Sequence, residues 1–185
     1  MKLHYPLSLL IALALLAWTQ KDTDYTQWAS YLGGPDRNHY STLNQITPEN
    51  VKDLQVAWTY SLPDSGQMQA NPIIVDGVLY GVSASVQAFA LDAATGKEIW
   101  RFGDPLKNWA STSRGVSYAK GRILYTVGPN LWALDAKTGK PIDTFGDHGK
   151  VDLHTGLPAI AQQCAAFAPR RRSKQQGLVA RYRRI

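Results

Sequence analysis

The sequence predicts an all-β fold built from short antiparallel strands. Two observations lead to this prediction. An eleven-residue motif occurs in two similar copies, ALDAATGKEIW at residues 90–100 and ALDAKTGKPID at residues 133–143. Short apolar runs separated by turn residues surround both copies. Because a repeat at a fixed period indicates one structural unit used more than once, the fold is expected to be built from copies of a small sheet.

The first unit contains four predicted strands between Pro72 and Phe102. The runs PIIV and VLYGV flank Asp76-Gly77. Asp-Gly between two apolar runs is a strong hairpin signal, because both turn positions tolerate positive φ. The runs VQAFAL and EIWRF follow, separated by the turn Asp-Ala-Ala-Thr-Gly. The order predicts a four-stranded antiparallel sheet.

The second unit repeats this plan. The runs GVSYA and RILYTV flank Lys120-Gly121, LWAL follows, and a turn beginning at Asp135 leads to PIDTF at residues 141–145. We therefore predict the fourth strand of this unit at residues 141–145. The Asp and the Gly of the turn each recur at a spacing of 43 residues, which supports one common architecture.

The two units together predict an incomplete β-propeller. A small four-stranded sheet cannot bury both faces alone, so it must stack on neighbours. Four short antiparallel strands in about 40–45 residues are the unit of a propeller blade. Residues 71–157 are thus predicted to form about two four-stranded blades. A β-sandwich that contains two similar hairpins is the alternative.

The N-terminal residues 1–20 are predicted to be a signal peptide. Lys2 provides a short positive region, and residues 7–17 are apolar apart from Ser8 and include small residues suited to cleavage. The alternative is a retained membrane anchor, although the apolar run is shorter than the roughly 20 residues that span a bilayer.

Residues 21–70 are predicted to form a lead-in to the blades. Gly33, Gly34 and Pro35 mark a turn. Thr47, followed by Pro48 and Glu49, is typical of the start of a short helix. Residues 56–60 then alternate in the period of a strand. A short N-terminal helix followed by one strand is expected.

The charge of the chain is concentrated in its tail. The net charge of +6 by itself suggests an anionic partner such as nucleic acid. Residues 1–158, however, hold 13 Lys and Arg against 14 Asp and Glu, whereas residues 159–185 hold seven basic residues and no acid. We therefore expect no nucleic-acid partner.

Residues 158–185 are interpreted as a non-homologous basic tail. They show no strand alternation and no turn spacing, and we interpret them as the frameshifted end of a longer reading frame. The single cysteine, Cys164, lies in this tail and has no partner for a disulfide within the chain.

The repeated motif resembles that of a known protein family. The frame Ala-x-Asp-x-x-Thr-Gly-x-x-x-Trp resembles the tryptophan-docking motif of the quinoprotein dehydrogenases, eight-bladed propellers that carry pyrroloquinoline quinone (PQQ). Its first copy is complete, with Ala90, Asp92, Thr95, Gly96 and Trp100, and its second copy holds Ala133, Asp135, Thr138 and Gly139. The resemblance runs from about Trp28 to Leu157, and at QMQANPIIVDGVLY and SRGVSY it is close to the membrane-associated glucose, polyol and alcohol dehydrogenases.

The motif has a physical logic. A tryptophan from the last strand of one blade can stack on the small Ala and on the Gly peptide plane of an adjoining motif, where a larger side chain would hold it away. In the second copy Asp143 stands where the first has Trp100. We therefore expect the second blade to lack this contact with a further blade.

The resemblance also implies cofactor-binding residues. An Arg before a Gly-Val-Ser/Thr-Tyr strand contacts PQQ in the family, and SRGVSY places Arg114 there. PQQ is a tricarboxylate with an ortho-quinone, and a guanidinium binds such oxygens through its planar fork. Gln69 matches a family position near the quinone. For both residues, a solvated loop side chain is the alternative.

No catalytic residue or metal ligand is predicted within this chain. The family uses PQQ with Ca²⁺, but its calcium ligands and catalytic carboxylate lie in later blades. His148 and His154 lie near Asp147 and Asp152, but the stretch is rich in Gly and lacks the spacing of a metal site. A solvated loop is the preferred interpretation.

The resemblance implies a function for the intact protein. We expect the N-terminal portion of a PQQ-dependent dehydrogenase in the periplasm or on the periplasmic face of the inner membrane, a location compatible with membrane association. Such an enzyme oxidises a sugar or alcohol and passes electrons to a quinone or a cytochrome. The chain by itself is expected to be inactive. The alternative is a non-catalytic PQQ-like propeller scaffold of the outer-membrane assembly type.

Overall fold

A computed structural model describes residues 25–34, 36–105, 113–156 and the backbone of residues 179–184. The predicted signal peptide and Cys164 lie outside these residues. Among the helices in the described ranges, none is long and apolar enough to cross a bilayer.

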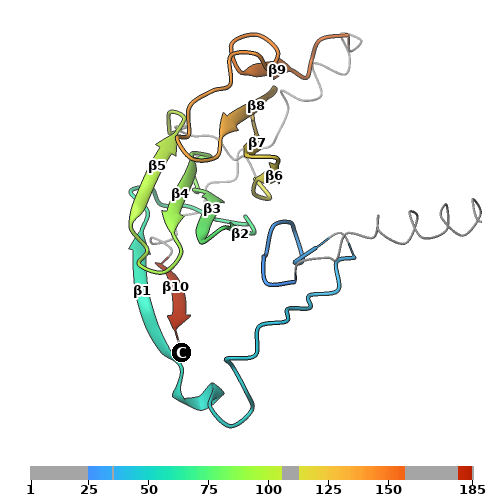
Figure 1. Ribbon diagram of the computed structural model, residues 1–185. Coiled ribbons are helices and arrows are strands. Elements are labelled where there is room, and N and C mark those ends of the chain that lie inside the picture. The colour runs from blue at the N-terminus through green and yellow to red at the C-terminus, as the bar shows by residue number, and fades with distance from the viewer. Residues whose placement is uncertain (1–24, 35, 106–112, 157–178, 185) are drawn as a thin grey trace, which may run out of the picture.

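Two four-stranded antiparallel sheets form the body of the fold (Figure 1). The first blade comprises β2 (Ile73–Val75), β3 (Val78–Val82), β4 (Ala88–Asp92) and β5 (Glu98–Phe102). The second blade comprises β6 (Ser117–Ala119), β7 (Arg122–Val127), β8 (Asn130–Asp135) and β9 (Lys150–Asp152). In each sheet the spatial order follows the chain order. The prediction of an all-β, incomplete propeller is confirmed.

The first hairpin of each blade uses the turn that the sequence predicts. Asp76 and Gly77 have φ of 50° and 75°, and Lys120 and Gly121 have φ of 49° and 77°. Two consecutive residues with positive φ match the right-handed twist of the flanking strands. The β2–β3 and β6–β7 registers follow directly from these turns.

The fourth strand of the second blade is not where the sequence pattern places it. Residues 141–145 make an isolated bridge between Pro141 and Leu134 and then turn away, and β9 forms later. Pro141 has no N–H to donate to β8, which explains why a strand does not begin there.

Ala133 shows how the strand is interrupted. Its carbonyl accepts the N–H of Ile142 at 2.9 Å, and its own N–H donates to the carbonyl of Gly149 at 2.9 Å. Gly149 has φ of 87°, and a Cβ there would lie 2.6 Å from Cβ of Pro141. Residues 143–148 are therefore a loop inserted into the fourth strand, and it begins at the position that Trp100 occupies in the first blade.

The predicted short helix is a single 3-10 turn, η1 (Val51–Asp53). The carbonyl of Thr47 accepts the N–H groups of Asn50 and Val51 at 3.2 and 3.0 Å, so a turn precedes η1. The predicted strand follows as β1 (Gln55–Ser61).

The beginning of the lead-in lies against the free edge of β2. Trp28 and Ile74 exchange backbone hydrogen bonds of 3.0 and 2.9 Å. The Oε1 of Gln27 also accepts the N–H of Asp76 at 2.9 Å. The lead-in thus extends the first blade at the edge opposite β5.

A further strand, β10 (Val179–Arg184), pairs antiparallel with β1. The register runs from Gln55 opposite Arg184 to Ser61 opposite Val179, with an irregularity between Val56 and Trp58. This strand belongs to the basic tail, where the sequence pattern predicts no strand.

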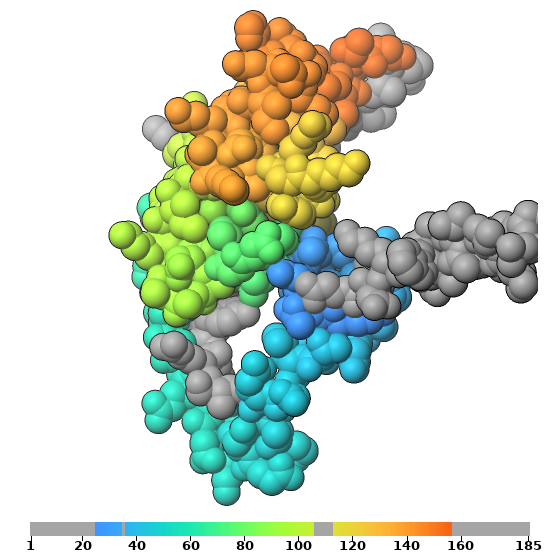
Figure 2. Space-filling model, in the orientation of Figure 1, coloured from blue at the N-terminus to red at the C-terminus, as the bar shows by residue number. Residues whose placement is uncertain are grey.

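The main core lies between the two blades. Figure 2 shows the first blade (green) packed directly against the second (yellow and orange). Val82 and Ile123 are fully buried, and Tyr80 of the first blade stacks on Tyr118 of the second with ring centroids 6.4 Å apart. Packing between blades therefore supplies the burial that one small sheet lacks.

Candidate functional site

The Asp-x-x-Thr-Gly turn of the first blade is held by one carboxylate. Oδ1 of Asp92 accepts the N–H of Ala94 at 3.1 Å, the N–H of Thr95 at 2.8 Å and the hydroxyl of Thr95 at 2.7 Å. The N–H of Gly96 donates to the Asp92 carbonyl at 2.8 Å. The hydroxyl of Thr95, followed by the backbone N–H groups of Thr95 and Ala94, lowers the pKa of Asp92 below its ordinary value.

The second blade reproduces this turn. Oδ1 of Asp135 accepts the N–H of Lys137 at 3.1 Å and the N–H and hydroxyl of Thr138 at 2.8 Å each. Gly139 donates to the Asp135 carbonyl at 2.8 Å. The pKa of Asp135 is likewise lowered, first by the Thr138 hydroxyl. The two turns therefore present matching glycines with positive φ, 72° at Gly96 and 70° at Gly139.

Trp100 of β5 reaches from the first blade onto the turn of the second. Its side chain is buried, and its Nε1–H donates to the carbonyl of Ala136 at 2.8 Å. A Cβ at Gly139 would lie 2.5 Å from Cδ2 of Trp100, so only a glycine lets the indole lie this close. Ala90 and Ala133, the small residues of the motif, are completely buried. This is the geometry that tryptophan docking requires.

Trp58 of β1 makes the same contact with the first blade. Its Nε1–H donates to the carbonyl of Ala93 at 3.0 Å, and a Cβ at Gly96 would lie 2.5 Å from Cδ2 of its indole. The sequence pattern places Trp58 in a strand but does not reveal this role. Its position 42 residues before Trp100 is the signal that could have revealed it.

The sequence pattern also does not reveal a polar cluster at the junction of β1 and β5. The hydroxyl of Tyr60 contacts Glu98 and Arg101, and Arg101 pairs with Glu98 at 2.8 Å. The hydrogen bond from Arg101 lowers the pKa of Glu98. Burial, with a contribution from Glu98, raises the pKa of Tyr60 to about 12. The three side chains tie β1 to the outer strand of the first blade.

The segments that carry the two predicted cofactor residues lie side by side. The N–H of Asn71 donates to the carbonyl of Arg114 at 3.0 Å, and Asn71 bridges to Gly115 in parallel. A Cβ at Gly115, whose φ is 121°, would lie 2.6 Å from the carbonyl oxygen of Asn71. The close approach therefore depends on the glycine that follows Arg114.

The two side chains differ in exposure. Arg114 is exposed, and no hydrogen bond or ion pair with another described residue engages its guanidinium. Gln69 is half-buried. Both precede the first strand of a blade, Gln69 before β2 and Arg114 before β6. The arrangement leaves the guanidinium available for an anionic ligand at this end of the blades.

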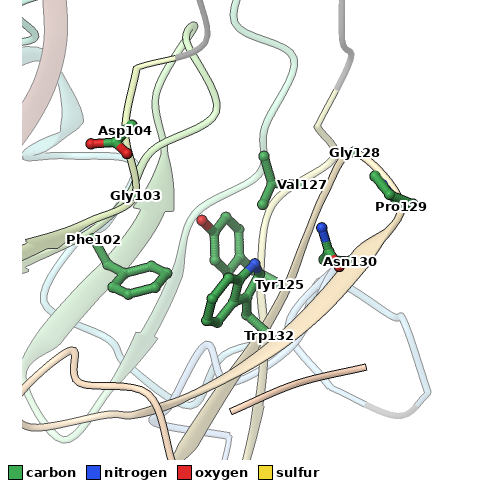
Figure 3. Close-up of a pocket in the computed structure, with 9 residues that line it drawn as sticks. All are labelled: Phe102, Gly103, Asp104, Tyr125, Val127, Gly128, Pro129, Asn130 and Trp132. Atoms are coloured by element: carbon green, nitrogen blue, oxygen red, sulfur yellow. The ribbon is translucent and has the colours of Figure 1, made fainter. Parts of the chain in front are cut away.

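A separate pocket of about 620 Å³ lies between the blades (Figure 3). The rings of Phe102, Tyr125 and Trp132 cluster together in it, and Asn130 and Asp104 lie on opposite sides. Burial raises the pKa of Tyr125 to about 12. Neither Gln69 nor Arg114 is among its lining residues, so this pocket is distinct from the candidate cofactor site.

The described ranges contain no group of three or more His, Cys, Asp or Glu side chains that could hold a metal ion. His148 lies 3.8 Å from Asp147, and both side chains are exposed to solvent.

Comparison with known proteins now places this arrangement in a class. Two blades joined by a tryptophan that lies on an Asp-x-x-Thr-Gly turn define a repeat propeller of the docking-motif type. Residues 28–174 match the family described as "PQQ: Glucose/ethanol/alcohol dehydrogenase, beta-propeller domain". The chain belongs to this family of PQQ-dependent quinoprotein dehydrogenases, which are oxidoreductases. The match extends beyond Leu157, where the resemblance found in the sequence ends.

Curated relatives agree with this assignment. The chain is 40% identical over 105 residues to the dehydrogenase subunit of the quinone alcohol dehydrogenase of Gluconobacter oxydans, a match that covers 53% of this chain and 14% of the relative. It is also 40% identical over 105 residues to quinoprotein glucose dehydrogenase A of Acinetobacter calcoaceticus, covering 50% of this chain and 13% of the relative. The chain thus spans about a seventh of their length.

Solved structures share the fold. The quinohemoprotein alcohol dehydrogenase of Comamonas testosteroni superposes with a TM-score of 0.62 at 28% identity, over 80% of this chain and 24% of that enzyme. The quinohemoprotein alcohol dehydrogenase ADHIIG of Pseudomonas putida gives 0.61 at 33% identity, over 71% of this chain and 20% of that enzyme.

Proposed function

We propose that this chain supplies two adjacent blades of a PQQ-dependent dehydrogenase that oxidises an alcohol or a sugar. The carrying observation is the exposed guanidinium of Arg114, in a segment just before β6 whose backbone is fixed by the hydrogen bond from Asn71 to the Arg114 carbonyl. The names of the relatives, which include alcohol and glucose dehydrogenases, support this substrate class.

The residues present fit part of a PQQ site. The guanidinium of Arg114, which no other described residue engages, can donate a planar pair of N–H groups to a carboxylate or to a quinone oxygen. The half-buried amide of Gln69 can add a single donor from the neighbouring segment. When bound, PQQ supplies the acceptor for the electrons that leave the substrate.

The protein's own contribution is positional. Gly115 allows the backbone of Asn71 to lie against the segment of Arg114, which fixes the start of β6 relative to β2. Trp100 fixes one blade to the next through Gly139 and Ala136. The backbone of Arg114 is therefore held next to two mutually anchored sheets, which limits the region that its guanidinium can reach.

The metal, the electron acceptor and the location belong to the larger assembly. Members of the family generally use Ca²⁺ or a related metal with PQQ. We propose that a quinone or cytochrome accepts the electrons, that the protein functions in the periplasm or at the periplasmic face of the inner membrane, and that residues 1–20 direct its export. We further propose that the chain alone is inactive, because it spans only about a seventh of its curated relatives.

A chimera tests the proposed function. Residues 28–156 replace the matching segment of the Comamonas testosteroni enzyme, and alcohol oxidation is measured while PQQ is titrated into the apo-protein. We expect activity that depends on PQQ. Arg114→Lys in the chimera should raise the PQQ concentration for half-maximal activity roughly tenfold, because an ammonium lacks the planar fork.

Arg122→Lys is the matched control, because Arg122 is an exposed arginine of β7 outside the segment of Arg114. It should leave the titration unchanged. An identical titration curve for Arg114→Lys would return Arg114 to the solvated-loop interpretation. A folded chimera without PQQ-dependent activity would instead favour the scaffold alternative.

A further inference from the structure

Three aromatic side chains from two blades meet at the pocket between the blades (Figure 3). Phe102 ends β5 of the first blade, whereas Tyr125 and Trp132 come from β7 and β8 of the second. The ring of Phe102 meets that of Tyr125 at 89° with centroids 6.1 Å apart, and that of Trp132 at 64° with centroids 5.1 Å apart. The rings are therefore steeply inclined to one another, as the walls of a corner are, and do not form a flat stack.

The only charge on the lining of this pocket is negative. Among the nine described residues that line it, Asp104 alone carries a formal charge. No hydrogen bond or ion pair with another described residue engages its carboxylate. The neighbouring carbonyl, that of Gly103, accepts the side-chain amide of Gln87 at 2.6 Å and has a second lone pair to offer. Acceptors and one free negative charge thus lie beside the aromatic rings.

The indole of Trp132 already interacts with a cation. Nζ of Lys150, in β9, lies 5.6 Å from the centroid of the ring, which is within the range of a cation–π interaction. Lys150 itself is not among the residues that line the pocket. The lysine therefore shows that an ammonium group can approach this ring closely while the pocket remains open.

We propose that this pocket binds a small quaternary ammonium compound, with its methyl groups against Phe102 and Trp132 and its charge balanced by Asp104. The electron-rich faces of aromatic rings attract a quaternary ammonium group, which has no N–H to satisfy. The pocket volume of about 620 Å³ is in the range of small-molecule sites. The proposal does not depend on the proposed function, because neither Arg114 nor Gln69 lines this pocket.

Other classes of ligand match the lining less well. A phosphate or a carboxylate would meet the Asp104 carboxylate, and no Lys or Arg lines the pocket to attract it. A sugar needs hydrogen-bond partners around its whole ring, whereas Asp104 and Asn130 lie on opposite sides of an aromatic wall. A neutral hydrocarbon would leave the charge of Asp104 without a role.

A titration of the full chain with choline tests the proposal. The matched ligand is its neutral isostere, in which a tert-butyl group replaces the trimethylammonium group, so that the two compounds differ in charge and hardly in shape. Tryptophan fluorescence measures affinity, and saturation-transfer NMR reports contact with the methyl protons. We expect choline to bind about tenfold more tightly than the isostere. Glucose at the same concentration should not displace it.

Two variants locate the site. Asp104→Asn and Phe102→Leu should each weaken choline binding about fivefold, because one removes the charge and the other removes an aromatic face. Both should leave binding of the isostere nearly unchanged. Asp147→Asn is the matched control, because Asp147 is an exposed acid outside the pocket, and it should not alter choline binding.

Four outcomes would overturn the proposal. They are no binding of choline, equal affinity for choline and its isostere, displacement of choline by glucose, and choline binding that Asp104→Asn does not weaken. Equal affinity would mean that the pocket selects shape alone, and displacement by glucose would identify a sugar site instead. Because Asp104 is exposed, its substitution should preserve the fold, so Asp104→Asn decides the outcome even if Phe102→Leu does not fold.

Discussion

The two blades share their turns and differ in their last strand. Asp92 and Asp135 each accept three hydrogen bonds from corresponding positions of their turns, and both turns present a glycine to an incoming indole. The first blade then continues into β5 with Trp100, whereas the second departs into the loop 143–148 before β9. The glycine turn that a tryptophan contacts is thus present in both blades. A docking tryptophan in the fourth strand is present only in the first.

Removal of the docking tryptophan is the largest expected perturbation. Trp100→Ala should lower the free energy of unfolding by about 3–5 kcal/mol, because a buried aromatic and its hydrogen bond to Ala136 are lost. Trp58→Ala should cost roughly half as much, because Trp58 is only half-buried. Urea unfolding followed by circular dichroism measures both. Equal losses would show that the two contacts are energetically equivalent despite their different burial.

The receiving glycine gives the next largest effect. Gly139→Ala should destabilise by about 2–4 kcal/mol, because the new Cβ meets the Trp100 ring and the alanine must adopt positive φ. Gly121→Ala is the matched control, since Gly121 has φ of 77° and a Cβ added there would meet no atom within 4 Å. It should cost only about 1 kcal/mol of backbone strain. Similar losses at the two glycines in thermal unfolding would remove the argument for close contact.

The shared carboxylate predicts a pH dependence common to both blades. The pKa of Asp92 and of Asp135 is lower in the folded state than in the unfolded chain. Their stabilisation is therefore complete above the unfolded pKa and is lost as the pH falls through the folded pKa. Asp92→Asn should reduce stability at about pH 6 and have less effect at about pH 3, and Asp135→Asn should behave in the same way. A pH-independent loss in urea titrations would contradict this carboxylate role.

The smallest effect is expected at the position where the repeat changes. Asp143→Trp restores the tryptophan that ends the motif in the first blade. Residue 143, however, is exposed and begins the loop rather than lying in a strand. The free energy of unfolding should change by no more than about 0.5 kcal/mol. A clear gain in stability would show that the loop can rearrange into a docking strand.

Local sequence signals predicted most of this fold. Asp76-Gly77 and Lys120-Gly121 specify their hairpins because turn geometry depends on two adjacent residues. The fourth strand of the second blade could not be placed in this way. Ala133 forms hydrogen bonds with residues at both ends of the loop 143–148, and the apolar pattern at residues 141–145 gives no sign of that loop. The pairing of β1 with β10 joins segments that are far apart in the sequence, and no periodicity in the basic tail predicts it.

The candidate site was predictable to a different degree. Arg114 and Gln69 were proposed from a resemblance, and their backbone neighbourhood follows from the bridge between Asn71 and Gly115, which no local pattern encodes. The role of Trp58 is not revealed by the motif, because no Asp-x-x-Thr-Gly turn precedes Trp58 in the sequence. The cluster of Tyr60, Glu98 and Arg101 escaped notice because its members come from strands that are far apart in sequence.

The direction of the tryptophan contacts has a consequence for symmetry. Each contact is heterologous: an indole on one unit meets a glycine turn on the next, so identical contacts repeated between separate molecules would propagate into an open series unless the rotation closed a ring. Here Trp58 fills the turn at Gly96 and Trp100 fills the turn at Gly139, both within one molecule. Within the described residues, each docking glycine is therefore already in contact with a tryptophan of the same molecule. Neither a free glycine turn nor a free docking tryptophan remains through which molecules could join head to tail into a filament.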